Sequence, residues 1–156
     1  MEQVMNASIP QRLGPCDAAA LSELETLCFS APWKVDQIKS ALGLPHFIAY
    51  GIKSQGALHA YIALAHIADE LEVLNLATHP TVRHAGLARS LLRHTFNEAL
   101  RLGVKRIILE VRVGNTPARN LYTSFGMTQI GVRQHYYADT GEDALILHKV
   151  LEKKPS

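Results

Sequence analysis

Apolar residues in the first third of the chain recur at the three- and four-residue spacing of amphipathic helices. Asp17 is placed to cap a helix that continues to about Cys28. The predicted buried stripe of this helix consists of Leu21, Leu24, Leu27 and Cys28. A proline interrupts the pattern, and a second, shorter helix is predicted over 35–42.

Apolar positions elsewhere form short alternating or continuous stretches bounded by turn residues, which is the pattern of β-strands. The predicted strands are 8–13, 47–53, 58–68, 71–78, 104–113, 127–136 and 144–151. Pro10 restricts the first of them to the edge of a sheet. The stretch 104–113 is almost continuously apolar, which is typical of a strand in the middle of a sheet.

The strongest helical pattern lies between two of these strands and covers 87–102. Its predicted core face consists of Leu87, Leu91, Leu92, Phe96, Ala99 and Leu100. A helix that connects strands 71–78 and 104–113 is a crossover, which makes those two strands parallel in an otherwise antiparallel sheet. A further short helix follows, with Asn115 or Thr116 as its cap.

This order of elements predicts an α/β (α+β) fold with a mixed, mostly antiparallel central sheet flanked by helices. We expect a single domain over residues 1–156, with a core at about 8–151 and loose ends at 1–7 and 153–156.

The composition of the chain limits the classes of protein to which it can belong. The chain is 47% hydrophobic and 19% charged, which fits a soluble globular protein, and a net charge of +2 is too weak to indicate direct nucleic-acid binding. It contains no apolar run of membrane-spanning length and no signal-peptide pattern, so we expect no membrane association. The isolated Cys16 and Cys28 are expected to be reduced, partly buried thiols of a cytoplasmic protein. The eight histidines show no metal-ligand spacing, so no metal is expected.

The candidate chemistry begins at the turn Arg83-His84-Ala85-Gly86-Leu87-Ala88-Arg89, between an apolar strand and the long helix. Backbone N–H groups at a helix N-terminus bind anions, and glycine allows a close approach, so this turn is a candidate phosphate site. It lacks the Gly-Lys-Ser/Thr of a P-loop and the G-x-G-x-x-G of a dinucleotide fold. The alternative is a tight turn with a solvated basic face.

The turn resembles the acetyl-CoA pyrophosphate motif of the GNAT N-acetyltransferase superfamily, Arg/Gln-x-x-Gly-x-Gly/Ala, which Arg83, Gly86 and Ala88 match. More narrowly, the chain resembles the RimI-type group, which acetylates the N-terminal alanine of a ribosomal protein. The residues that carry this likeness are Pro32-Trp33, Glu110-Val111-Arg112, Asn115, Tyr122, Arg133, Tyr136-Tyr137 and Glu142-Asp143-Ala144. His84 and Ala85 stand where that group often has arginine and glutamine.

The resemblance implies a GNAT fold that binds acetyl-CoA. Backbone groups of Leu76, Ala77 and Thr78 would bind the acetyl-pantetheine end. The turn residues His84, Ala85, Gly86, Leu87, Ala88 and Arg89 would bind the phosphates. Asn115 is a helix cap, a CoA contact or both. Tyr136 and Tyr137 line a peptide groove, with Glu142 or Asp143 meeting the acceptor, or they belong to an ordinary polar hairpin. Trp33 is either a groove residue or a core residue.

Glu110 and Tyr122 are the candidate catalytic pair. Glu110 shares a strand face with Ile108 and Arg112, and a carboxylate there is costly unless it is paired or used. The resemblance favours a general base that acts through water; the alternative is a surface or ion-paired glutamate. Tyr122 is implied to be the general acid for the departing thiolate; the alternative is a packing tyrosine.

The expected acceptor is an N-terminal amine, because its pKa of about 8 makes it easier to deprotonate than a lysine at about 10.4. We therefore expect an acetyl-CoA-dependent enzyme whose partner is the N-terminal segment of a ribosomal protein. Two alternatives stay open: a GNAT enzyme for lysine or a small-molecule amine, and a CoA-binding regulatory domain without turnover. A weakly bound protein partner, the oligomeric state and the use of other acyl-CoA donors are also left open.

Overall fold

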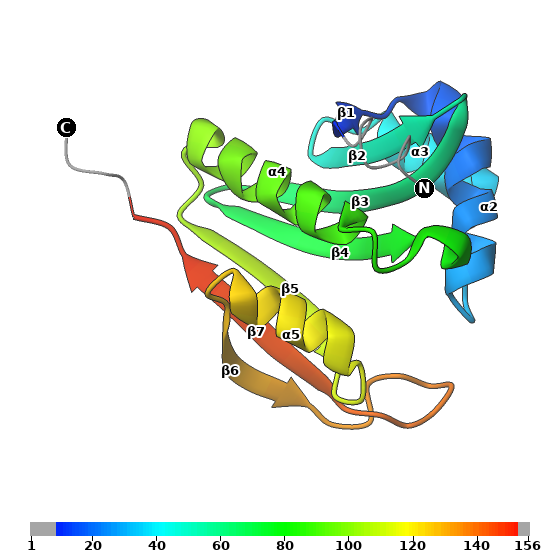
Figure 1. The fold of residues 1–156 in the computed structure, drawn as a ribbon. Helices are drawn as coiled ribbons and strands as arrows, with labels where there is room; N and C mark the ends of the chain where they lie inside the picture. Colours follow the sequence, from blue (N-terminus) through cyan, green and yellow to red (C-terminus); the bar gives the residue numbers. More distant parts are fainter. Residues whose placement is uncertain (1–8, 153–156) are drawn as a thin grey trace.

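A twisted seven-stranded sheet forms the centre of the computed structural model, which describes residues 9–152 (Figure 1). The strands are β1 Gln11–Arg12, β2 Phe47–Ser54, β3 Ala57–Ile67, β4 Glu70–Thr78, β5 Arg106–Arg112, β6 Thr128–Arg133 and β7 Ala144–Val150. Their order in the sheet is β1-β2-β3-β4-β5-β7-β6. Within residues 9–152, only β4 and β5 pair in parallel, which confirms the predicted crossover and the central place of the 104–113 segment.

Helices cover both faces of the sheet. The long α4 (Leu87–Leu102) and the short α5 (Thr116–Ser124) pack on one face, and α2 (Ala18–Cys28) and α3 (Val35–Leu42) pack on the other. Alternating strand side chains divide between the two cores: Ile48 and Tyr50 face α4, whereas Phe47 and Ala49 face α2 and α3. Two short 3₁₀ turns, η1 Pro15–Asp17 and η2 Pro80–Val82, lead into α2 and toward α4. The mixed, mostly antiparallel fold is therefore confirmed.

Three predictions about helix residues are wrong. Leu27 and Leu100, predicted to be core, are 51% and 55% exposed, because each lies beyond the edge of its helix's buried stripe. Asp17 precedes α2 but does not cap it. Its carboxylate instead accepts the Gly14 N–H and pairs with Lys53 at 2.6 Å, which ties the start of α2 to β2.

Two predicted strands are shorter than expected. The 8–13 segment forms only β1, and its Ser8, like the predicted loose ends at 1–7 and 153–156, lies outside the described residues. The 127–136 segment pairs only as far as Arg133, because the chain then leaves the sheet as the β6–β7 loop. Cys28 is half-buried as expected, but Cys16 is exposed. Within the described range, every helix is too short or too polar to cross a bilayer.

Strands β4 and β5 separate halfway along their length. They pair from Glu70 to Val73 on β4, opposite Arg106 to Leu109 on β5. Beyond that point β4 continues to pair only with β3, and β5 only with β7. A register shift against β3 leaves Leu74 as an extra residue on β4 at the place where the strands part. The sheet is thus open in its middle, between the ends of β4 and β5 (Figure 1).

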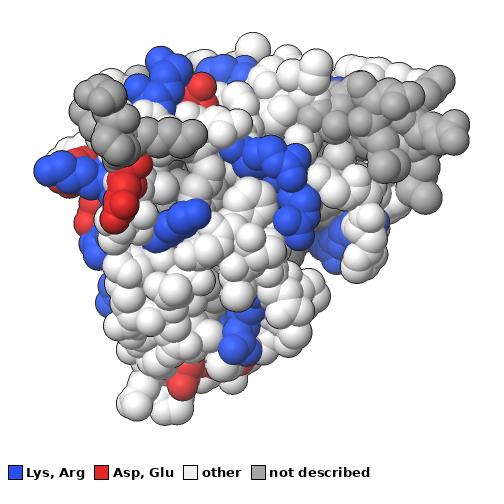
Figure 2. Space-filling model, turned by 60° about the vertical axis from the view of Figure 1, so that its left-hand side comes forward, with Lys and Arg blue, Asp and Glu red and all other residues white. Residues whose placement is uncertain are grey.

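Basic side chains are dispersed over the face shown in Figure 2, where Lys and Arg stand in separate groups with uncharged surface between them. This distribution fits the net charge of +2.

Candidate active site

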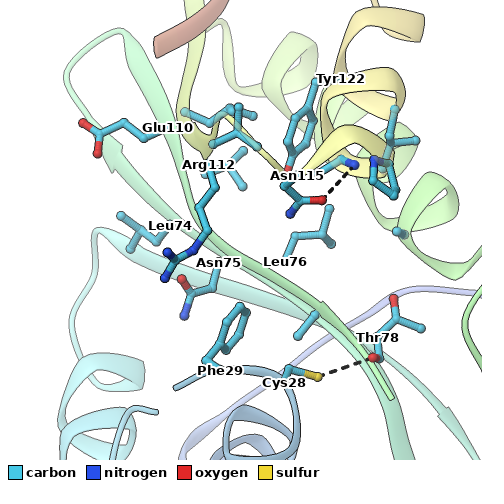
Figure 3. Close-up of a pocket in the computed structure, with 18 of the residues that line it drawn as sticks. Cys28, Phe29, Leu74, Asn75, Leu76, Thr78, Glu110, Arg112, Asn115 and Tyr122 are labelled. Carbon is cyan, nitrogen blue, oxygen red and sulfur yellow. Dashed lines mark hydrogen bonds between the residues drawn. The ribbon is translucent and has the colours of Figure 1, made fainter. Parts of the chain in front are cut away.

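A cleft of about 960 Å³ occupies the opening between β4 and β5. Its walls come from β4, β5, the start of α4, α5, the loop after α2 and the loop between β6 and β7 (Figure 3). Every residue predicted to be catalytic or to bind the cofactor lines it except Ala85, which is half-buried against the core beneath α4, and the predicted acceptor residues Glu142 and Asp143 do not line it. The cleft therefore collects, from segments far apart in the sequence, the residues that the motifs singled out.

The predicted phosphate turn leads directly into α4. Gly86 precedes the helix with a left-handed backbone (φ 81°), and no side chain caps the first turn. A Cβ at Gly86 would meet nothing within 4 Å, so the glycine is required by its backbone conformation rather than by lack of space. The N–H groups of the first turn thus carry the partial positive charge of an uncapped helix end. This end of α4 can accept an anion at the wall of the cleft.

The β4 wall presents backbone groups to the cleft. The Thr78 carbonyl accepts the Cys28 thiol at 3.4 Å and the Arg83 Nε at 3.3 Å, so it points away from β3. Because alternate residues of a strand turn their backbone groups to the same side, Leu76 points in that direction too. Ala77 turns its backbone toward β3. Of the three predicted backbone contacts, Leu76 and Thr78 are therefore the ones whose polar groups face the cleft.

The α5 wall holds Asn115 and Tyr122. The Asn115 side chain accepts the Ala118 N–H at 3.2 Å, so it caps α5 and also lines the cleft (Figure 3). Tyr122 is 7% exposed, and burial, followed by the charge of nearby Tyr137, raises the pKa of its hydroxyl to about 12. That hydroxyl is protonated at neutral pH and is therefore a hydrogen-bond donor. Arg89 donates to Ser124 at 3.2 Å, which links the start of α4 to α5.

Glu110 lies on the other face of β5, because its neighbours Leu109 and Val111 belong to the core beneath α4 and α5. Its carboxylate accepts the Arg133 Nε at 2.5 Å. The Tyr136 hydroxyl also hydrogen-bonds to Glu110, which raises the pKa of Tyr136. Burial, and then the nearby Glu110 charge, raise the pKa of Glu72. Glu110 is thus ion-paired, as the alternative interpretation holds, and it also lines the cleft.

The β6–β7 loop closes over the same face. Arg112 binds Asp139 through two hydrogen bonds of 2.8 and 2.9 Å, and the same carboxylate accepts the Ser30 hydroxyl at 2.9 Å. Tyr136 and Tyr137 both line the cleft, and the Arg112 guanidinium lies 3.9 Å from the centre of the Tyr137 ring. Glu142 and Asp143 accept backbone N–H groups of Gly114 and His135, so these two carboxylates organise the loop.

Trp33 is both a groove residue and a core residue, the two alternatives given for it, because it lines the cleft and also packs near Phe47 in the core. Sequence reasoning missed Glu25 and Asn75. Glu25 is a carboxylate only 1% exposed, on the side of α2 that faces the sheet, and Asn75 on β4 lines the cleft and donates to Glu25. Glu25 lies four residues after Leu21, on the stripe of α2 that is predicted to be buried, and this position is the signal by which the sequence could have identified it.

Within residues 9–152, no three His, Cys, Asp or Glu side chains are grouped closely enough to hold a metal ion.

A sheet opened between two parallel strands, with an uncapped helix end at the opening, has the architecture of an acyl-CoA-dependent transferase, and the family comparison agrees. The model described as Acetyltransferase (GNAT) family matches residues 18–127. The chain belongs to this family, whose members use acetyl-CoA, and it is an N-acetyltransferase.

The similar proteins narrow the likeness to the RimI-type group, as the motifs predict. A Bacillus subtilis protein named putative [ribosomal protein bS18]-alanine N-acetyltransferase is 36% identical over 126 residues, which cover 80% of this chain and 83% of the relative. The Escherichia coli K12 [ribosomal protein bS18]-alanine N-acetyltransferase is 31% identical over 133 residues, covering 84% and 89%. The crystal structure of the ribosomal-protein-S18-alanine N-acetyltransferase from Escherichia coli superposes with a TM-score of 0.86 at 28% identity, over 94% of this chain and 95% of that one.

Proposed function

We propose that the protein transfers the acetyl group of acetyl-CoA to the N-terminal alanine of a ribosomal protein of the bS18 type. The observation that carries the proposal is the opening through the sheet. It has the uncapped start of α4 and Tyr122 on one side, and Glu110 with the β6–β7 loop on the other. Two substrates entering from opposite sides would meet at the parted strands. The names of the similar bacterial proteins support this choice of acceptor.

The α4 side would hold the donor. The phosphates would lie against the first-turn N–H groups of Leu87, Ala88 and Arg89, after the left-handed Gly86. Backbone groups of Leu76 and Thr78 would bind the pantetheine arm and polarise the thioester carbonyl. Acetyl-CoA supplies the activated acetyl group, and the chain supplies the position in which an amine can reach it.

Glu110 would act as the base on the opposite side. During transfer, a bond forms between the amine nitrogen and the acetyl carbon, the carbon–sulfur bond breaks, and the nitrogen loses a proton. Arg133 and Tyr136 hold the Glu110 carboxylate in place, and a water between this carboxylate and the amine would carry the proton to it. An α-amine with a pKa of about 8 suits such a base better than a lysine at about 10.4.

Tyr122 would stabilise the departing sulfur. Its pKa of about 12 lies above the value of about 8.5 that is typical of a thiol, so complete proton transfer to a free thiolate is uphill. Its hydroxyl would therefore act first as a hydrogen-bond donor to the developing thiolate. The sulfur finally takes up the equivalent of the proton that the amine released.

The test is an acetylation assay with mass-spectrometric detection. We expect acetyl-CoA to modify the α-amine of an alanine-first peptide, and an otherwise identical peptide with a blocked N-terminus and an internal lysine to remain unmodified. Modification of the lysine peptide alone, or of small amines alone, would overturn the proposed acceptor. Tight acetyl-CoA binding without CoA release with any amine would indicate a regulatory domain instead.

A further inference from the structure

Glu25 is the most deeply buried acidic side chain outside the machinery described so far, at 1% exposed. It projects from α2 into a core formed with residues such as Leu21, Leu24 and Ala63. None of the partners that the described residues supply to it carries a positive charge. Burial raises the pKa of this carboxyl, and a buried, unpaired carboxylate is costly to keep. An apolar side chain of the same size would avoid burying a carboxyl but would leave the groups that donate to Glu25 without an acceptor.

The partners of Glu25 all belong to segments that border the cleft or lie directly behind it. The Tyr61 hydroxyl on β3 and the Asn75 side-chain nitrogen on β4 both donate to Oε1, the second at 2.6 Å. The backbone of Trp33, in the loop after α2, also hydrogen-bonds to the carboxylate. Both Trp33 and Asn75 line the cleft. Glu25 therefore fastens one wall of the cleft from behind.

These contacts determine which end of the Asn75 amide faces the cleft. The amide nitrogen is committed to Glu25 and lies 3.4 Å from the Tyr61 hydroxyl. The amide oxygen must then point the other way, and it accepts no hydrogen bond from residues 9–152. This oxygen is not fully buried, and Asn75 lines the cleft, so we take the oxygen to face the cleft. An amide oxygen only accepts hydrogen bonds, and its complement is an N–H group.

Asn75 lies at the place in the cleft where we expect the N–H groups of the acceptor amine. It follows the extra residue Leu74 directly, at the point where β4 leaves β5. Its side chain lies on the α2 face of the sheet, the face to which Glu110 and Arg112 also point. Figure 3 shows Asn75 and Arg112 on the same side of the cleft, with Tyr122 across from them. This is the acceptor side, opposite the start of α4.

We propose that Glu25 is a positioning residue for the acceptor, which holds the Asn75 amide so that its oxygen accepts an N–H of the acceptor's amino group. One N–H held by Asn75 leaves the nitrogen lone pair free to point toward the thioester carbon. Asn75 contacts the substrate, and Glu25 acts only through Asn75. The inference rests on the proposed transfer to an amine, and it adds the groups that orient that amine.

The decisive variants are Glu25→Met and Asn75→Ala. Tyr61→Phe is the matched control, because it removes a donor to Glu25 and the weaker 3.4 Å contact to the Asn75 nitrogen but leaves the 2.6 Å bond between Glu25 and Asn75 intact. With the alanine-first peptide, we expect Glu25→Met and Asn75→Ala each to raise the acceptor KM about tenfold, the upper end of what one hydrogen bond between neutral groups contributes. The Kd of acetyl-CoA should stay within about twofold of wild type. The double variant should be no worse than either single variant, because both remove the same contact.

Acetyl-CoA affinity separates this role from a merely structural one. Glu25→Met leaves the donors to the carboxylate without an acceptor, so its Tm should fall, whereas the acetyl-CoA Kd should hold. Glu25→Gln keeps an oxygen for the Asn75 nitrogen and should restore most of the acceptor affinity. Additive losses in the double variant, or a fall in acetyl-CoA affinity that parallels the kinetic loss, would overturn the proposal. If Glu25→Met does not fold, an unchanged acceptor KM in Asn75→Ala overturns it alone.

The activity of wild type distinguishes a failure of the proposed acceptor from a failure of the role proposed for Glu25. If wild type acetylates the alanine-first peptide and the variants match it, only the role of Glu25 fails. If wild type acetylates the lysine peptide instead, the proposed acceptor fails, and the same variants measured on that peptide decide the role of Glu25.

Discussion

Arg112 at the end of β5 binds Asp139 of the β6–β7 loop through two parallel hydrogen bonds, and Asp139 in turn accepts the Ser30 hydroxyl from the loop after α2. One exposed carboxylate thus joins the two loops that border the acceptor side of the cleft. The Arg112 guanidinium holds the pKa of Asp139 down to about 2, so this link remains ionised at every pH at which the enzyme would be assayed.

Replacing Asp139 with Asn should loosen this link and raise the acceptor KM by about two- to fivefold, the range expected for an exposed bidentate ion pair. Acetyl-CoA, bound at the other side, should keep its affinity. Asp69→Asn removes an exposed partner of Lys105 away from the cleft and is the matched control. Steady-state kinetics with varied peptide measure the effect; an equal change in both variants would count against the link.

Gly86→Ala should weaken acetyl-CoA binding. Alanine pays about 1–2 kcal/mol in a left-handed backbone, and relief of this strain would turn the first N–H groups of α4 away from the phosphates. Gly103 at the other end of α4 has the same backbone region (φ 73°) and equally open surroundings. Gly103→Ala should therefore lose similar stability and keep its acetyl-CoA Kd. Calorimetric titration of both variants checks this, and equal Kd values would contradict it.

Tyr122→Phe should lower kcat by about 100-fold, because the departing thiolate loses its hydrogen-bond donor. The acetyl-CoA Kd should change little, since the ring and its packing remain. Tyr50→Phe is the control, because Tyr50 is also buried but its hydroxyl reaches Glu98 instead of the cleft. Full activity of Tyr122→Phe would reduce this residue to a packing role.

Glu110→Gln should lower kcat/KM by a similar factor of about 100, because the amide cannot take up the proton. The Gln side chain still accepts the Arg133 N–H, so the local geometry should survive. Glu98→Gln, which alters an ion pair with Arg101 on the outer surface of α4, should leave turnover unchanged. Rates measured at saturating acetyl-CoA provide the comparison. Wild-type rates for Glu110→Gln would exclude the carboxylate as the base.

The burial of Glu25 predicts a pH-dependent stability. Its pKa is raised above the ordinary 4.5, so the folded state holds this proton more tightly than the unfolded state does. Wild type should therefore lose stability as the pH rises from about 4.5 through the raised pKa, and the Tm advantage of Glu25→Gln should grow over that window. Glu98, whose pKa is lowered by the hydrogen bond from Arg101, should show the opposite trend in Glu98→Gln. Melting curves from about pH 2 to about pH 8 test both signs, because the Glu98 window lies below 4.5 and the Glu25 window above it.

The elements that local patterns determine could be predicted from the sequence. The 3.6-residue period of α4 and its place between two strands indicate the parallel pair, and the polar residues Asn115 and Thr116 before Pro117 indicate a helix cap, which is Asn115. Leu100 was misplaced because a leucine next to a buried stripe looks like part of it. Hydrophobicity alone does not tell the edge of a stripe from its centre.

The contacts that shape the cleft depend on residues distant in sequence. Glu110 meets Arg133 only because β6 and β5 both border β7, and Glu25 meets Asn75 only after α2 packs on β4. The extra residue at Leu74 has no local signature, since it is defined by pairing with β3. Motif likeness supplied the catalytic candidates, whereas their orienting partners emerge only from the assembled sheet.

Because β4 and β5 separate, the backbone hydrogen bonds between them stop halfway along the two strands. Leu76 and Thr78 turn backbone groups toward a side on which no strand of residues 9–152 pairs with them, although the Thr78 carbonyl is already held by Cys28 and Arg83. A pantetheine arm carries amide groups, so the donor substrate would take the place of a neighbouring strand along the end of β4. Binding of the donor would then complete the sheet, and the reactive acetyl carbon would lie at the end of the pantetheine arm.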